Sequence, residues 1–229
     1  MSIQFSSKIK GIIFDLDGTL YHIRWYMKPL FMVLLFPYCT RLPSLMNVRK
    51  SFAGKVMKDG DELNKAIAQR IAATSINSST SSVITWIHSR FYPSFEKIMP
   101  FLRGSRPGLN NTLKTVKEKH YKLAVLSDFK WIKERLKGLK INDILFDTLL
   151  STETEGALKP SPQSFNNIAE EWNINPSEIL VIGDRIDTDG KGAENAGMQF
   201  LQITDKLVTQ KGHNWKSIKE LLENLPLLK

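Results

Sequence analysis

Short apolar runs, rich in β-branched residues and ending at polar ones, alternate with helical patterns along much of this chain. The apolar runs lie at 8–14, 122–126, 146–150, 178–182 and 200–203. Helical patterns occupy 109–120, 131–137, 164–172 and 191–196. Because strands and helices that alternate in this way form a parallel sheet, the pattern predicts an α/β fold with a Rossmann-like sheet and helices on both faces.

The pattern changes between residues 21 and 100, where aromatic and basic side chains dominate. Apolar residues four apart predict a helix over 59–73, and a second helix is expected over 83–91. This segment is expected to be a mainly α-helical insertion. We therefore expect two domains, an α/β core of residues 1–20 and 101–229 and an inserted domain of residues 21–100.

The longest apolar stretch of the chain runs from Pro29 to Cys39. Its eleven residues are too few for a membrane span, which needs roughly 20. The N-terminus lacks the basic and then apolar order of a signal peptide, so we expect a cytoplasmic protein. The wider run 26–39 is expected to form a core helix of the insertion. The alternative is a surface that contacts a partner or a membrane.

The composition is that of a soluble globular protein, with 42% hydrophobic and 24% charged residues in a chain of 229. Cys39 is the single cysteine, which excludes an intrachain disulfide, and four scattered histidines argue against a structural zinc site. The net charge of +9 is concentrated in residues 21–100, which hold eleven basic and four acidic side chains. Such a segment could attract an anionic substrate, nucleic acid or an anionic membrane, or it could be a solvated face without a partner.

Polar side chains follow three of the predicted strands, namely Asp15 and Asp17, Ser127 and Asp128, and Asp184. Because ligands bind where the carboxyl ends of parallel strands meet, we expect these side chains to lie together. Clustered carboxylates repel each other unless a cation lies among them, and Mg²⁺ is the usual ion for such oxygen ligands.

Lys159, Asp187 and Asp189 extend this candidate site. An ammonium group, a serine hydroxyl and a divalent ion together form a clamp for a phosphoryl group. The residue types therefore favour phosphoryl chemistry.

The order of these residues resembles the haloacid dehalogenase (HAD) superfamily of phosphohydrolases. Four motifs carry the resemblance: Asp15-Leu-Asp-Gly-Thr19 after an apolar strand, Ser127 closing Val-Leu-Ser, Lys159-Pro160, and Gly183-Asp184-Arg-Ile-Asp-Thr-Asp189. They cover residues 9–20 and about 105–204, and leave 21–100 uncovered. An insertion between the first and second motifs resembles subfamily I, in which a helical cap closes over the site and excludes water.

The resemblance implies a role for each motif residue. Asp15 would be the nucleophile that attacks phosphorus and forms an aspartyl-phosphate. Asp17 would protonate the leaving oxygen and later deprotonate the attacking water. The others would shape the loop or bind phosphate: Gly18 by allowing a close backbone approach, Thr19 by hydrogen bonds, Ser127 by holding a phosphoryl oxygen, and Lys159 by neutralising charge.

The same resemblance implies a Mg²⁺ site made of Asp15, the backbone carbonyl of Asp17, and Asp184, with Asp189 as a further or more distant ligand. Asp187 could replace Asp189 or be merely solvated. Asp17 also separates phosphoryl transfer from the dehalogenase branch, which lacks a carboxylate at that position because a leaving halide needs no proton.

We therefore expect a Mg²⁺-dependent phosphatase that hydrolyses a small phosphate monoester. A phosphomutase on the same scaffold, or a non-catalytic protein that binds an acidic partner through the basic segment, are the alternatives. We expect a small phosphorylated substrate, no nucleic-acid partner, no membrane span, and a monomer or homodimer. Basic residues that could meet a second anionic group of the substrate, or lie on the surface without such a role, are Arg24, Lys28, Arg41, Arg49 and Lys50.

His22 stands where many relatives carry an acidic residue. This difference weakens any inference about substrate from those relatives. We expect His22 to be a hinge-loop residue, with contact to the leaving group as the alternative.

Overall fold

The computed structural model of the chain describes residues 8–74, 78–205 and 212–228. Within these ranges, five parallel strands form a sheet in the order β3-β2-β1-β4-β5. The strands are β1 (Gly11–Phe14), β2 (Lys122–Ser127), β3 (Thr148–Ser151), β4 (Ile179–Gly183) and β5 (Gln199–Gln202). The α/β fold with a Rossmann-like sheet is confirmed.

Helices cover both faces of the sheet because successive strand residues point to opposite sides. Ile12 and Phe14 of β1 belong to one apolar cluster and Ile13 to another. Residues of α6 (Leu109–Glu118), α7 (Ile132–Gly138) and α10 (Trp215–Glu223) join the first cluster. Residues of α8 (Gln163–Trp172) and α9 (Lys191–Asn195) join the second. Short helical turns lie between these elements: η3 (Asp143–Leu145), η4 (Pro176–Glu178) and η5 (Ile186–Gly190).

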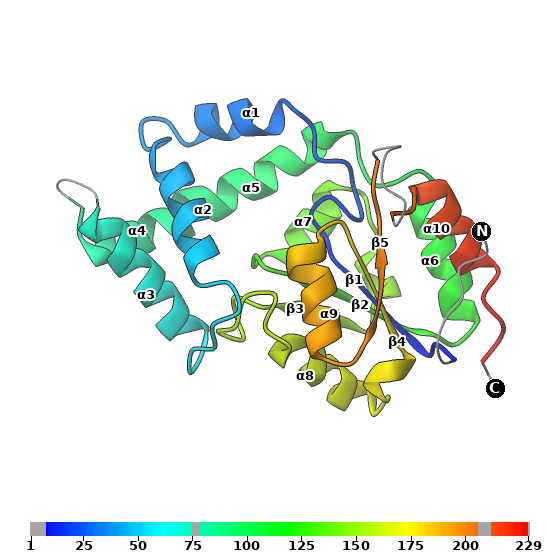
Figure 1. Cartoon of the computed structure of the whole chain (residues 1–229). Coiled ribbons are helices and arrows are strands. Elements are labelled where there is room, and N and C mark those ends of the chain that lie inside the picture. The colour runs from blue at the N-terminus through cyan, green and yellow to red at the C-terminus, as the bar shows by residue number, and fades with distance from the viewer. Residues whose placement is uncertain (1–7, 75–77, 206–211, 229) are drawn as a thin grey trace.

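Residues 21–100, which we call the cap, form a group of helices beside the sheet (Figure 1). They are α1 (Met27–Leu34), α2 (Arg41–Ser51), α3 (Gly60–Ala73), α4 (Thr80–Trp86), η1 (Ile87–Phe91) and α5 (Tyr92–Ile98), followed by η2 (Met99–Leu102).

Aromatic packing joins the cap to the rest of the fold. The ring of Phe31 lies 6.0 Å from that of Phe91 and 5.3 Å from that of Phe95. Phe129, which follows β2, contacts both Phe91 and Phe95 with ring centroids 5.8 and 5.4 Å apart. The cap and the sheet therefore share one continuous apolar cluster.

Several elements differ from the sequence prediction. The helix expected over 83–91 instead runs from α4 through the π-helical turn η1 into α5. Helices α2 and α10 were not anticipated. The run 26–39 forms only one short helix, α1, which buries Phe31. Val33 of α1 and Phe36, just beyond its end, remain 71% and 76% exposed.

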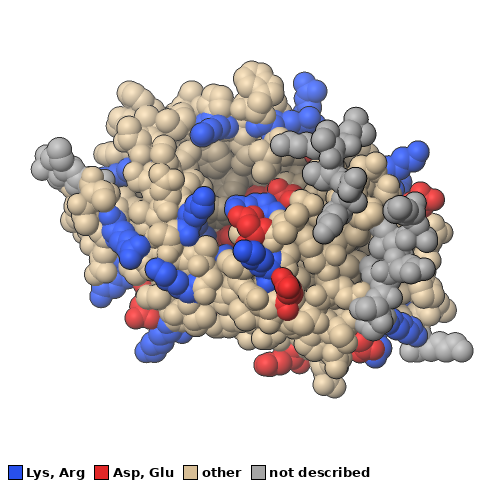
Figure 2. Space-filling view, in the orientation of Figure 1, with Lys and Arg blue, Asp and Glu red and all other residues tan. Residues whose placement is uncertain are grey.

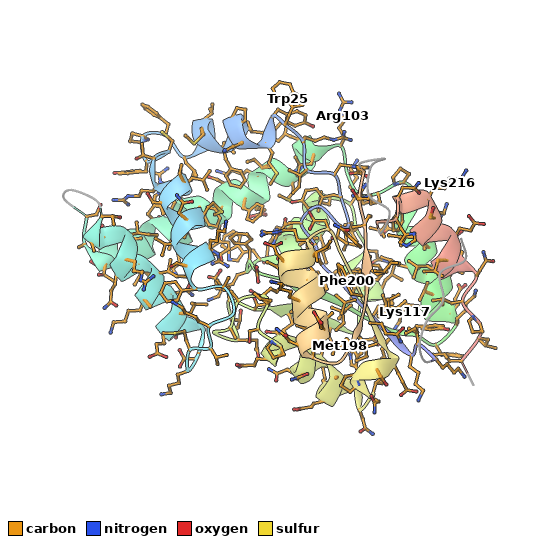
Figure 3. All side chains as sticks on the ribbon, viewed as in Figure 1. Trp25, Arg103, Lys117, Met198, Phe200 and Lys216 are labelled. Atoms are coloured by element: carbon orange, nitrogen blue, oxygen red, sulfur yellow. The ribbon has the colours of Figure 1, made fainter. Side chains whose placement is uncertain are left out.

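Trp25 precedes α1, is 86% exposed and projects outward from the cap (Figure 3). Within the described ranges, none of the helices combines the length and apolar character needed to cross a membrane.

Candidate active site

Strand pairing brings three of the predicted site residues to one edge of the sheet. β1 lies between β2 and β4, and Phe14 is aligned with both Val125 and Ile182. Asp15 follows β1, Ser127 ends β2 and Asp184 follows β4. The carboxyl ends of the three strands thus place these side chains as the strand-end pattern predicts.

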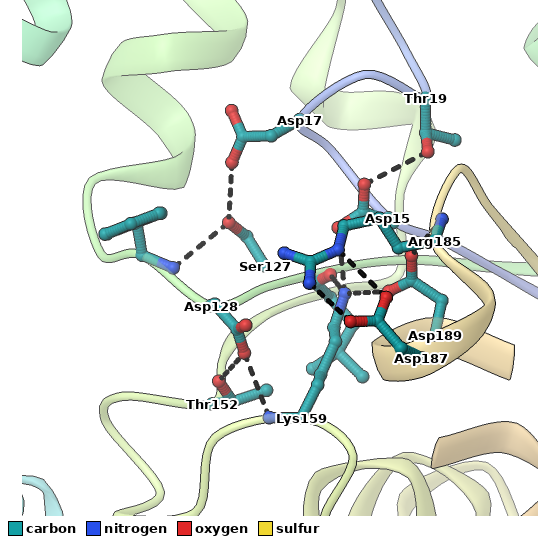
Figure 4. Close-up of polar contacts among 12 residues, drawn as sticks. Asp15, Asp17, Thr19, Ser127, Asp128, Thr152, Lys159, Arg185, Asp187 and Asp189 are labelled. Carbon is teal, nitrogen blue, oxygen red and sulfur yellow. Dashed lines mark hydrogen bonds and ion pairs between the residues drawn. The ribbon is translucent and has the colours of Figure 1, made fainter. Parts of the chain in front are cut away.

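Lys159 joins Asp15 to the fourth motif (Figure 4). Its buried ammonium donates hydrogen bonds of 2.8 Å to Asp15 Oδ1, to Asp189 Oδ1 and to the carbonyl of Leu126. Burial alone would lower the pKa of Lys159, but the charges of Asp15 and Asp189 outweigh it and raise the pKa above its ordinary value. Lys159 is therefore a permanent cation beside Asp15.

Asp128 holds the backbone that carries Lys159. Its Oδ1 accepts a 2.5 Å hydrogen bond from Thr152 Oγ1 and a 3.1 Å bond from the Lys159 amide. This carboxylate positions the lysine loop instead of joining the acidic cluster.

Asp15, Asp184 and Asp189 form that cluster, with one carboxylate oxygen of each within 4.8 Å of the others. Asp187 lies outside it and pairs with Arg185 at 2.6 Å, with 61% of its side chain exposed. The structure thus brings Asp189 to the cluster and leaves Asp187 at the surface.

The electrostatics of the cluster fit a divalent cation. Burial, reinforced by the neighbouring carboxylates, raises the pKa of Asp15 well above its ordinary value and that of Asp184 to about 6. Lys159 supplies one positive charge to three carboxylates. None of the described residues donates a hydrogen bond to the Asp184 carboxylate. A hard ion that takes oxygen ligands, such as Mg²⁺, suits this donor set.

Gly18 and Thr19 shape the first-motif loop in different ways. Gly18 has φ +90°, and a Cβ there would lie 2.5 Å from Asp184 Oδ2. Both the backbone conformation and the lack of space therefore require glycine. Thr19 Oγ1 donates a 3.0 Å hydrogen bond to Asp15 Oδ2, which orients the carboxylate.

Asp17 faces away from the acidic cluster and is held by three groups. The Tyr21 hydroxyl donates a 2.5 Å hydrogen bond to Asp17 Oδ1, and Arg135 forms an ion pair with the same oxygen. Ser127 Oγ lies 3.5 Å from Asp17 Oδ2 and accepts a 3.0 Å bond from Arg135. Burial and the nearby Asp17 charge raise the pKa of Tyr21 well above its ordinary value, so its hydroxyl remains a donor.

Sequence reasoning missed Tyr21 and Arg135. Arg135 did leave a signal, because it stands on the apolar side of its helix with Ile132, Leu136 and Leu139 and is fully buried. A charged side chain in such a position is rare unless it is paired. No comparable signal marks Tyr21.

Two of the five candidate cap cations, Arg24 and Lys28, line a cavity that also reaches Asp17. Arg41 instead donates to Ser78 and stacks on aromatic rings, and Lys50 is exposed. Arg49 is buried against Glu153. The expectation of a surface position is therefore wrong for Arg49, whose charge is neutralised within the protein.

His22 takes part in a network of polar contacts with Asp205 and Arg106. Its ring contacts Asp205 at 2.7 Å and the Arg106 guanidinium at 2.8 Å. Arg106 in turn donates to the carbonyls of Gly18 and Thr19 at 2.7 and 3.1 Å. His22 therefore belongs to a network that supports the backbone of the loop.

Comparison with known proteins agrees with this geometry. Residues 9–197 match the sequence model of the haloacid dehalogenase-like hydrolases. The chain belongs to this family. The resemblance of the four motifs and the expectation of a HAD-family hydrolase are thereby confirmed.

Relatives of this HAD chain include proteins named glyceraldehyde 3-phosphate phosphatase. That of Methanocaldococcus jannaschii is 27% identical over 206 residues, which cover 85% of this chain and 85% of the relative. That of Pyrococcus furiosus is 33% identical over 94 residues, which cover 41% of this chain and 39% of the relative. This second match thus spans about two fifths of the relative's length.

A HAD hydrolase from Bacillus subtilis, solved in a magnesium-bound form, superimposes with a TM-score of 0.66. The two proteins are 15% identical, and the match covers 94% of this chain and 99% of the other. At this identity the likeness shows a shared fold, including the region of the cap.

Proposed function

We propose that this HAD protein is a Mg²⁺-dependent phosphatase that hydrolyses a phosphate monoester through an aspartyl-phosphate at Asp15. The proposal rests on one arrangement. The Asp15 carboxylate lies between Lys159 and Thr19 and next to Asp184, while Asp17, two residues further on, is held apart. A nucleophile and an acid–base group are thus separated in space, as a double displacement requires.

In the first half of the reaction, a carboxylate oxygen of Asp15 attacks phosphorus and the bond from phosphorus to the leaving oxygen breaks. Asp17 gives its proton to that oxygen, and an alcohol leaves. Lys159 and Ser127 offset the negative charge that spreads over the phosphoryl oxygens. Thr19 keeps the Asp15 carboxylate in one orientation.

In the second half, a water molecule attacks the aspartyl-phosphate and Asp17 accepts its proton. Arg135 and Tyr21, which both contact Asp17 Oδ1, keep this carboxyl group in one orientation. Phosphate then leaves, and the Asp15 carboxylate is restored. Asp15, Asp184 and Asp189 would hold the metal, which supplies charge neutralisation for the phosphoryl group and the nucleophile.

The test measures phosphate release from an aryl phosphate with Mg²⁺ in wild type, Asp15→Asn and Asp187→Asn. Asp187 is the matched control because its exposed carboxylate lies in the same motif but outside the cluster. We expect turnover by wild type and Asp187→Asn, and a loss of at least about a thousandfold in Asp15→Asn, as for removal of a nucleophile.

A second variant tests the intermediate. In Asp17→Asn the second half lacks its base, whereas an aryl leaving group needs little protonation in the first half. Acid-quenched Asp17→Asn should therefore carry one phosphoryl group on the peptide that contains Asp15, detectable by mass spectrometry. Folded wild type that binds Mg²⁺ but releases no phosphate from any monoester would contradict the proposal. Isomerisation of a sugar phosphate without release would instead support the phosphomutase alternative.

A further inference from the structure

A cavity of about 670 Å³ lies between the cap and the core. Figure 2 shows the surface hollowed there, with charged side chains gathered on one side of the hollow. Its volume is within the range typical of small-molecule sites. A hollow of this size beside the candidate active site is large enough to hold the leaving group of a substrate.

The cavity walls are overwhelmingly apolar. They come from cap helices α1, α2 and α5, from η1, and from the segment after β2. Among the lining residues are three methionines, Met27, Met32 and Met46, and four phenylalanines, which include Phe31, Phe95 and Phe129. Methionine side chains are flexible and adapt to apolar ligands of varied shape, and aromatic rings supply large contact areas.

The charged groups of the lining are few. Asp17 reaches the cavity on the core side, and Arg24 and Lys28 contribute from the cap. Arginine and lysine side chains also have apolar stems that can cover a hydrophobic ligand while the charged end meets water. A strongly polar ligand would therefore find few partners along most of the wall.

The place of Asp17 shows which part of a substrate the cavity receives. Asp17 lines the cavity, whereas Asp15 and Lys159 do not. In phosphoryl transfer the leaving oxygen lies opposite the nucleophile, on the far side of phosphorus. The group attached to the oxygen that Asp17 protonates therefore extends into the cavity, and the phosphate itself stays at the strand ends.

We propose that the substrate is a phosphate monoester of an apolar alcohol, whose hydrocarbon part fills this cavity as the leaving group. This proposal rests on the proposed phosphatase function and adds the class of substrate. The relatives named glyceraldehyde 3-phosphate phosphatase carry a name that specifies a small polar substrate. In this chain most of the wall that such a leaving group would meet is formed by methionine and phenylalanine side chains, which offer its oxygens no hydrogen bonds.

The test uses a series of n-alkyl phosphates from ethyl to octyl, each below the concentration at which it forms micelles. Glycerol phosphate and glucose 6-phosphate serve as polar comparisons. We expect kcat/KM to rise roughly two- to fourfold for each added methylene, and about fiftyfold or more over the series, because each buried methylene contributes hydrophobic free energy. Polar monoesters turned over as efficiently as octyl phosphate, with no effect of chain length, would overturn the proposal while leaving the phosphatase function intact.

A pair of variants ties the preference to this cavity. Met46→Gln places an amide on the wall, and Met57→Gln makes the same change at a half-buried methionine that does not line the cavity. Met46→Gln should lower the ratio of octyl to ethyl phosphate kcat/KM roughly three- to tenfold. Met57→Gln should leave the ratio unchanged. Equal ratios in both variants, with wild type still preferring octyl phosphate, would place the apolar site elsewhere and overturn the assignment of the cavity.

A binding measurement separates the two proposals if nothing is hydrolysed. Octylphosphonate and ethylphosphonate cannot be cleaved, and calorimetry gives their affinities with Mg²⁺ present. Octylphosphonate that binds at least tenfold more tightly supports the apolar site even though the phosphatase proposal has failed. Equal affinities overturn the apolar site.

Discussion

The guanidinium of Arg49, on cap helix α2, lies 2.7 Å from the carboxylate of Glu153 in the core. Both side chains are nearly inaccessible to solvent, at 8% and 1% exposure. Tyr92 of the cap donates to the same carboxylate oxygen, and Arg49 also donates to the carbonyl of Asp128. Because Asp128 holds the Lys159 loop, this pair links the position of the cap to that of Lys159.

Arg49→Met is expected to destabilise the protein by about 3 kcal/mol, because it leaves the Glu153 carboxylate buried without its cation. Adding Glu153→Gln to this variant should restore part of the loss, since no buried charge then remains. Urea unfolding measures both effects. The exposed pair between Arg185 and Asp187 is the control, and Asp187→Asn should change the free energy of unfolding by less than about 1 kcal/mol. An equally small effect of Arg49→Met would show that the buried pair does not hold the cap.

Tyr21→Phe removes one donor to Asp17 while keeping the ring. We expect kcat to fall roughly tenfold, because Asp17, the proposed acid–base group, loses part of its orientation. Tyr121→Phe is the matched control, because this buried hydroxyl donates to the carbonyl of Pro226, far from Asp17 in the chain. A kcat that is unchanged in Tyr21→Phe would show that this hydrogen bond does not position Asp17 for the reaction.

Stabilisation by Mg²⁺ is expected to depend on pH. The pKa of Asp184 in the folded protein is about 6, against an ordinary value of 3.8, so the folded state binds this proton more tightly than the unfolded state does. Without metal, that contribution to stability is present below pH 3.8 and is lost as the pH rises through about 6. Mg²⁺ bound as proposed would take the place of the proton.

The rise in Tm on adding Mg²⁺ should therefore be larger at pH 7.5 than at pH 5.0. Differential scanning calorimetry of metal-free and Mg²⁺-loaded protein at the two pH values measures this difference. In Asp184→Asn most of the pH dependence should disappear. A gain in Tm that is the same at both pH values would mean that the ion does not compete with the Asp184 proton.

Gly18→Ala is expected to weaken the metal site more than the fold. The new Cβ would lie 2.5 Å from Asp184 Oδ2, so the carboxylate must move, and a positive φ disfavours alanine. We expect the affinity for Mg²⁺, measured by titration calorimetry, to fall at least tenfold. The free energy of unfolding should fall by only about 1–2 kcal/mol. Gly197→Ala provides the comparison, because it has φ +71° but no atom nearer than 3.9 Å to the new Cβ. Gly197→Ala should lower the free energy of unfolding by a similar amount, because its backbone is strained in the same way, but it should leave the affinity for Mg²⁺ unchanged.

The order of apolar runs was enough to predict the sheet, because a buried parallel strand is locally apolar and stops at polar residues. The same reasoning failed for α2, whose polar and apolar residues do not form a clear stripe and which contains Pro43. It also missed the junction of α4, η1 and α5, because a π-helical turn is defined by i→i+5 backbone hydrogen bonds and has no sequence pattern of its own.

The sequence by itself determined the α/β architecture, the family, and the positions of Asp15, Asp17, Lys159 and Asp184, because each depends on residues close together in the chain or on a motif. Only the tertiary structure decided that Asp189 joins the cluster while Asp187 faces solvent. It alone paired Asp17 with Arg135 and Arg49 with Glu153, which are 118 and 104 positions apart in the chain. The apolar cavity was likewise beyond prediction, since its walls come from separate helices whose inner sides meet only when the cap packs against the core.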